Sequence, residues 1–114
     1  MQPKILKYIL DIESVIEEIE SIKQKTQNDF NNFSNDIILQ RAVERDLEII
    51  GEAIRNIIDI NPDIKITASR NIIGLRNLIS HSYDSVEIEI LWGIIQKNIP
   101  LLAEEIRNLR GHNN

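Results

Sequence analysis

The chain has 114 residues, a length that predicts one domain over residues 1–114 and excludes two. Its 42% hydrophobic and 27% charged residues are typical of a soluble globular protein, and without cysteine it has neither disulfides nor thiolate metal sites. The net charge of −5 argues against broad binding of nucleic acid but allows a small basic site. No signal peptide or bilayer-spanning apolar run is present in the sequence, so we expect no membrane association and a cytoplasmic location.

The first apolar pattern predicts a helix from about Pro3 to Lys25. Its apolar residues recur at steps of three and four, with glutamates on the other face; they are Ile5, Ile9, Ile12, Ile16 and Ile19. A polar loop is then expected over Thr26 to Phe33, with Phe30 and Phe33 packed against the helices.

A second long helix is expected to start with Ser34 or Asn35 as its cap and Asp36 in its first turn. The predicted buried face comprises Leu39, Val43, Leu47, Ile50, Ile54, Ile57 and Ile58. Asn61-Pro62 should end the helix, because a residue before proline is pushed out of the helical region.

Two further helices follow in the sequence. Thr67 is expected to cap a third helix, and the capping-box spacing from Asp84 to Glu87 predicts a fourth directly after Tyr83. The apolar stripe of the fourth comprises Ile88, Leu91, Ile95, Ile99, Leu102, Ile106 and Leu109, and Pro100 should kink it. Trp92 could stack on a base, but its helical spacing favours the core or a dimer interface.

Four helices with short connections predict an all-α fold, an antiparallel four-helix bundle. The last helix has more apolar width than one small bundle needs, because Ile90, Trp92 and Ile94 extend its stripe. Such an excess predicts a partner, and a homodimer is the commonest solution.

The candidate site lies in the predicted third helix, where an arginine, a histidine and a tyrosine follow the spacing Arg-x4-His-x-Tyr: Arg76, His81 and Tyr83. His81 could act as general acid or base near neutral pH, and Arg76 could hold a phosphate and stabilise developing charge. Together they suffice in principle to cleave RNA without a metal ion, using the ribose 2′-hydroxyl as nucleophile. No cofactor is expected.

Helical geometry constrains this site. Arg76 and Tyr83 are seven residues apart and would share a face, whereas His81 would point about 140° away from Arg76 on a continuous helix. Either the helix ends near Ser80, or a second chain completes the site.

Each of the three side chains also has an ordinary structural interpretation. A helical arginine is commonly solvated, a histidine near a helix end often only complements the dipole, and a tyrosine between helices often belongs to the core. A metal site on Glu44, Glu48 and Glu52 is disfavoured, because Arg41, Arg45 and Arg55 are interleaved with them on what predicts a solvated charged face.

The sequence resembles the HEPN superfamily, and more narrowly the HepT-like toxins of HEPN/minimal-nucleotidyltransferase toxin–antitoxin systems. The resemblance is carried by Arg76-Asn77 with His81 and Tyr83, by the segment Glu48-Ile49-Ile50-Gly51-Glu52-Ala53, and by Leu91-Trp92 and Pro100. It therefore spans nearly the whole chain.

This resemblance implies a homodimeric HEPN-like helical bundle and a metal-independent ribonuclease of a type VII-like toxin–antitoxin system, with its active groove at the dimer interface. Arg76 and His81 match the catalytic pair, and Asn77 matches the polar residue that follows the arginine. Tyr83 matches the tyrosine that the partner, a minimal nucleotidyltransferase antitoxin, modifies with AMP. The RNA substrate is expected to be tRNA or mRNA.

Two other hypotheses stay open at this point. One is a non-catalytic dimeric module that recruits or regulates a nucleotidyltransferase. The other is a structural helical bundle in which the spacing of Arg76, His81 and Tyr83 is accidental.

Overall fold

The computed structural model describes residues 1–67 and 87–111, and all the regular structure in these ranges is helical. The helices are α1 (Pro3–Lys25), α2 (Phe30–Ser34), α3 (Ile37–Ile60), α5 (Ile88–Gly93), the π-helical η1 (Ile94–Asn98) and α6 (Ile99–Gly111). We call residues 88–111, which form α5, η1 and α6, the C-terminal arm. The predicted all-α class is thus confirmed.

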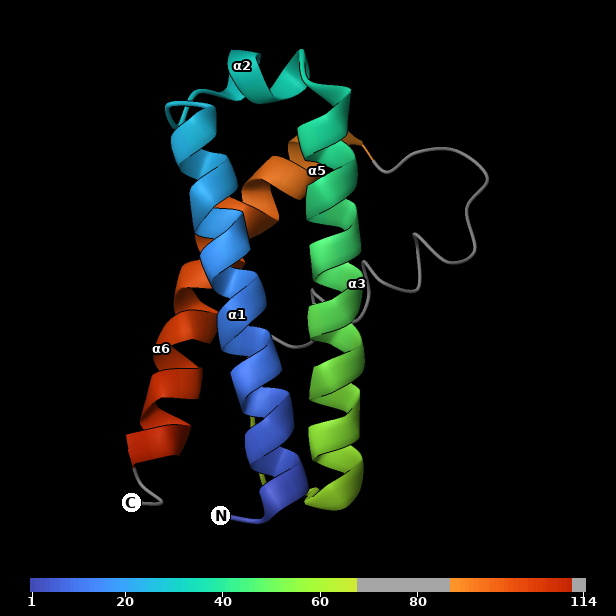
Figure 1. Ribbon diagram of the computed structural model, residues 1–114, viewed down its shortest axis with the longest axis vertical. Helices are drawn as coiled ribbons and strands as arrows, with labels where there is room; N and C mark the ends of the chain where they lie inside the picture. The colour runs from blue at the N-terminus through green and yellow to red at the C-terminus, as the bar shows by residue number, and fades with distance from the viewer. Residues whose placement is uncertain (68–86, 112–114) are drawn as a thin grey trace.

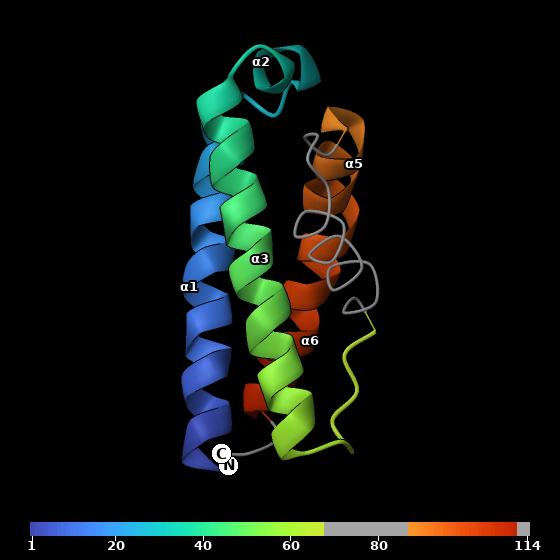
Figure 2. The same ribbon diagram turned by 90° about the vertical axis from the view of Figure 1, so that its right-hand side faces the viewer.

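The two long helices α1 and α3 run antiparallel and side by side, and the C-terminal arm packs against them (Figure 1, Figure 2). Their shared core is almost entirely aliphatic. Its fully buried aliphatic side chains include Ile9, Ile12, Ile19, Leu47, Ile50, Ile54, Ile57, Leu91, Ile95, Ile99 and Leu102. Among the helices in the described parts of the chain, none is both long enough and apolar enough to cross a membrane.

The first helix has the predicted bounds, and local hydrogen bonds explain both ends. Gln2 caps it, since the side-chain oxygen accepts from the backbone N–H groups of Lys4 and Ile5 at 2.7 and 3.1 Å. At the other end, Gln27 and Asn28 have positive φ values of 57° and 54°, which a right-handed helix cannot continue.

The predicted loop over Thr26 to Phe33 is wrong in one respect, because its second half is helical. Asp29 caps the short helix α2 by accepting from the backbone N–H of Asn32 at 3.1 Å. The helix places Phe33 in the core with no exposed surface, in contact with Trp92 at a ring-centroid distance of 5.2 Å. Phe30 contacts the same indole at 6.0 Å, so the partly buried Trp92 belongs to an aromatic cluster packed against the core.

The predicted cap of the second long helix is also wrong. Asp36 is the N-cap of α3, and its carboxylate accepts from the backbone N–H of Leu39 at 3.1 Å. Ser34 and Asn35 are not used there because they complete α2, and Asn35 donates its amide back to the carbonyl of Asn31 at 2.9 Å. The end of α3 at Ile60, just before Asn61-Pro62, is confirmed.

A kink is expected at Pro100, and the described arm has a π-helical stretch just before this proline. Five residues before the proline, Ile94–Asn98, widen into η1, and the N–H of Ile99 bonds to the carbonyl of Ile94. Proline lacks an N–H and its ring would collide with the carbonyl four residues earlier in a regular α-helix. Widening the turn relieves that collision while the chain stays helical.

The aromatic cluster gives a test of the fold. Phe33→Ala should lower the free energy of unfolding by about 3–5 kcal/mol, because it removes a fully buried ring from against Trp92. Urea unfolding followed by circular dichroism measures this loss. Phe30→Ala, which truncates the half-buried ring of the same cluster, should cost clearly less. Equal urea midpoints for Phe33→Ala and the unaltered protein would contradict the placement of Phe33.

Candidate functional site

The residues predicted to do chemistry, Arg76, Asn77, His81 and Tyr83, lie outside the described residues. The same holds for the predicted third helix beyond Thr67 and for the capping residue Asp84. The structure describes the two places where the chain leaves and rejoins its described part, at Thr67 and Glu87. These two residues flank the segment of chain that carries the motif.

The first flank is held on α6. Ile66 is only 4% exposed and belongs to the core. The next residue, Thr67, donates twice to one carboxylate oxygen of Glu105, from its backbone N–H at 2.8 Å and from its hydroxyl at 3.0 Å. The chain is therefore tied to α6 at the point where it enters the segment that carries the motif.

The second flank is the start of the C-terminal arm. Glu87 is not helical, with φ −57° and ψ 134°, and α5 begins at Ile88. The predicted fourth helix, expected to start directly after Tyr83, therefore does not include Glu87. Glu87 precedes the helix without a capping hydrogen bond from its side chain. One turn later Leu91 is fully buried and fixes α5 to the core.

Both flanks consequently lie on the same arm. Thr67 contacts it at Glu105, near its C-terminal end, and Glu87 leads into its first turn. Positions 87 and 105 are five helical turns apart, or about 27 Å at 1.5 Å per residue. Residues 68–86 have to connect two points separated by roughly that distance along one helical arm.

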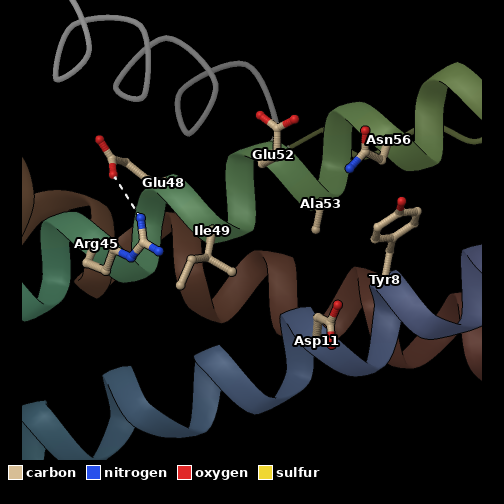
Figure 3. A pocket seen from close by; sticks show the side chains of 8 residues that line it. All are labelled: Tyr8, Asp11, Arg45, Glu48, Ile49, Glu52, Ala53 and Asn56. Atoms are coloured by element: carbon tan, nitrogen blue, oxygen red, sulfur yellow. Dashed lines mark ion pairs between the residues drawn. The ribbon is translucent and has the colours of Figure 1, made fainter.

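Described residues of α1 and α3 line a groove between these two helices (Figure 3). Its volume is about 380 Å³, and its lining residues are Tyr8, Asp11, Arg45, Glu48, Ile49, Glu52, Ala53 and Asn56. Arg45 lies 3.8 Å from the carboxylate of Glu48 in an exposed ion pair, and it is the one cation among three carboxylates. The described lining is net negative, which disfavours phosphate, and it includes no histidine, so the groove is a poor site for RNA chemistry.

The outer face of α3 is the interleaved charged surface that the sequence predicts. Arg45 pairs with Glu48, and desolvation raises the pKa of Glu44, helped by the negative charge of Glu48 and opposed by Arg41. Within residues 1–67 and 87–111, no three histidine, aspartate or glutamate side chains gather as metal ligands would.

Sequence reasoning missed one buried ionisable residue, Asp46 on the α1-facing side of α3. It is 5% exposed, and its Oδ2 is buried without a hydrogen-bond partner among the described residues. Burial raises the pKa of Asp46 to about 6, with a further increase from Glu18 on α1 and a decrease from Arg45. A signal was present, because Asp46 falls between Val43 and Ile50 on the apolar stripe of the helix.

Comparison with known proteins identifies the family to which the chain belongs. The sequence matches a family described as "Ribonuclease HepT-like" over residues 12–109, a range that includes the whole Arg76–Tyr83 motif. It is 35% identical over 107 residues to "Probable ribonuclease HepT" of Thermococcus cleftensis, covering 90% of this chain and 93% of that protein. It is 32% identical over 94 residues to "Putative RNase MJ1380" of Methanocaldococcus jannaschii, covering 81% and 86% of the two chains. No solved structure gives a significant match.

The buried carboxylate predicts a specific pH dependence of stability. The pKa of Asp46 is about 6 in the folded protein against 3.8 for an unperturbed carboxyl group, so the folded state binds this proton more tightly. The stabilisation that the folded state gains from this proton is therefore fully present below pH 3.8 and is lost as the pH rises through about 6. The free energy of unfolding falls by roughly 2 to 3 kcal/mol over this range.

Asp46→Asn removes this titration and should raise the free energy of unfolding at pH 8 while changing it little at pH 4. Urea unfolding at a series of pH values measures the difference. Asp59→Asn, on an exposed position of the same helix, is the control. A constant difference between Asp46→Asn and the unaltered protein from pH 4 to pH 8 would rule out this titration.

Proposed function

Because the chain belongs to the HepT-like ribonuclease family, we propose that it cleaves RNA without a metal ion, as the toxin of a type VII-like toxin–antitoxin system. The observation that carries this proposal is the family match over residues 12–109, a range that contains Arg76 and His81 of the Arg-x4-His-x-Tyr motif. The family itself accounts for the ribonuclease activity. The absence of a metal requirement, the pairing with an antitoxin and the roles of individual residues are our proposals.

The proposed reaction is an internal transesterification. The ribose 2′-oxygen attacks the adjacent phosphorus, the bond from phosphorus to the 5′-oxygen breaks, and a 2′,3′-cyclic phosphate forms. His81 accepts the 2′-hydroxyl proton or donates a proton to the departing 5′-oxygen, and Arg76 stabilises the extra negative charge on the phosphate. Asn77 supports the site as a polar neighbour of Arg76.

A homodimer would let both histidine roles be filled in one groove, with one His81 from each chain. One geometric argument and one observation support a partner of this kind. On a continuous helix Arg76 and His81 of one chain would diverge by about 140°. In addition, large apolar side chains are exposed at the start of α3, with Ile37 at 59% and Ile38 at 76%.

Control of the toxin is proposed to act through Tyr83. Transfer of AMP to its phenol by a minimal nucleotidyltransferase antitoxin would place negative charge and bulk beside Arg76 and His81, and RNA would be repelled. The substrate class that fits a toxin of this size is tRNA or mRNA.

The second candidate is a non-catalytic dimeric module that recruits or regulates a nucleotidyltransferase. The net charge of −5 and the acidic groove between α1 and α3 favour it, because both suit a protein partner better than RNA. This candidate predicts tight association with the nucleotidyltransferase and no RNA cleavage by the purified protein.

The catalytic proposal is tested with purified protein and labelled RNA in the presence of EDTA. Cleavage should persist, and Arg76→Ala and His81→Ala should each reduce its rate at least about 100-fold while circular dichroism shows unchanged folding. Arg107→Ala, at an exposed position of α6, and His112→Ala, which removes the other histidine, should cleave normally. Loss of cleavage on chelation would overturn the metal-independent mechanism.

The proposed control is tested by intact mass. Incubation with the nucleotidyltransferase and ATP should add whole AMP units to the chain and abolish RNA cleavage. Tyr83→Phe should prevent both, whereas Tyr8→Phe, which removes the other tyrosine, should prevent neither. AMP found on Tyr83→Phe protein would show that the modified residue is a different one.

A further inference from the structure

The contact between Thr67 and Glu105 joins residues 38 positions apart in the sequence. Both donors of Thr67 reach the same oxygen, Oε2 of Glu105, at 2.8 and 3.0 Å. Hydrogen bonds to a carboxylate are stronger and more directional than those between neutral groups. The side chain of Glu105 therefore fixes both the backbone and the side chain of Thr67.

Glu105 is itself held on a firmly packed element. Leu102 and Ile106, on either side of it in α6, have 0% and 1% exposure. Near the end of the same helix, Arg110 bonds to both carboxylate oxygens of Glu13 on α1, at 2.9 and 3.1 Å. The anchor point is thus fixed relative to the α1–α3 pair.

The two flanks of residues 68–86 are held differently. Buried Ile66 and the bonds of Thr67 tie the first flank to α6, whereas Glu87 at the second makes no side-chain capping bond. The first flank carries the specific polar contact. Arg76 follows Thr67 by nine residues in the sequence, so Thr67 is the last described residue before the motif.

We propose that Glu105 is a positioning residue, which holds Thr67 on α6 and so fixes the point from which the chain carrying Arg76 and His81 departs. The inference rests on the proposed function for its effect on catalysis. It doesn't require Glu105 to touch RNA. Displacement of a catalytic group by even about 1 Å can reduce a rate about 100-fold, so a distant tether affects turnover.

The experiment compares Glu105→Ala, Glu105→Gln and the control Glu104→Ala in the full chain. Glu104 is the exposed neighbour of Glu105, and its substitution changes the net charge equally. Hydrogen exchange measured by mass spectrometry reports on the Thr67 amide directly, and steady-state RNA cleavage gives kcat and KM separately.

Glu105→Ala should speed exchange of the Thr67 amide severalfold and lower kcat about tenfold with little change in KM, because positioning and not RNA binding is lost. Glu105→Gln keeps an oxygen that can accept both bonds, so it should restore most of the protection and the turnover. Glu104→Ala should match the unaltered protein in both measurements.

Thr67→Val tests whether the effect passes through this contact. It removes the hydroxyl donor and keeps the backbone N–H, so its loss of turnover should be in the same direction and smaller. Combined with Glu105→Ala, it should add little further loss, since both substitutions disrupt one interaction.

Several outcomes would overturn the inference. Unchanged exchange at Thr67 in Glu105→Ala would show that the tether is unimportant in solution. Faster exchange with a kcat equal to that of Glu104→Ala would show that the tether doesn't position the site. If the unaltered protein cleaves no RNA, the proposed function fails, and the tether is then judged by the exchange measurement alone.

Discussion

Isoleucine and leucine side chains from α1 and α3 meet along an aliphatic contact that holds the described structure together. The C-terminal arm packs onto these two helices through Leu91, Ile95, Ile99 and Leu102, all with no exposed surface. The bonds between Thr67 and Glu105 and the aromatic cluster at Trp92 both depend on where the arm lies. Burial of aliphatic surface is non-directional, so the directional contacts at helix ends and between helices have to select one arrangement.

Periodicity in the sequence predicts the helices well and their ends less well. The stripes of α1 and α3 depend on spacing alone, and their burial follows it. The start of α3 depends on which polar residue caps it, and Ser34 and Asn35 belong to the end of the short helix α2 instead. A helix of five residues is too short to show a periodic apolar pattern in the sequence. Asp46 was overlooked because a carboxylate inside an apolar stripe is rare. The positions of Arg76 and His81 depend on how residues 68–86 lie, which spacing alone doesn't determine.

The acidic groove on the described surface disfavours RNA, whereas the family of the chain indicates that the protein binds RNA. A ribonuclease has to bind a polyanion, yet the groove between α1 and α3 carries three carboxylates and one arginine. The two are compatible if RNA approaches a separate basic site built around Arg76 and its copy in a second chain. The acidic surface would then disfavour non-productive binding elsewhere on the protein.

The π-helical turn η1 has a consequence for how this chain can vary. A π turn holds one more residue than an α turn, so deleting one residue between Ile94 and Asn98 would restore an α turn and largely keep the phase between α5 and α6. The same deletion in α6, ahead of Glu105, would rotate the residues that follow it by about 100°. The buried stripe would no longer be continuous, and Glu105 would turn away from Thr67. Within the arm, η1 is thus the place where losing one residue leaves the aromatic cluster at one end and the tether at the other in the same angular relation. A one-residue deletion is accordingly tolerated better in η1 than in α6.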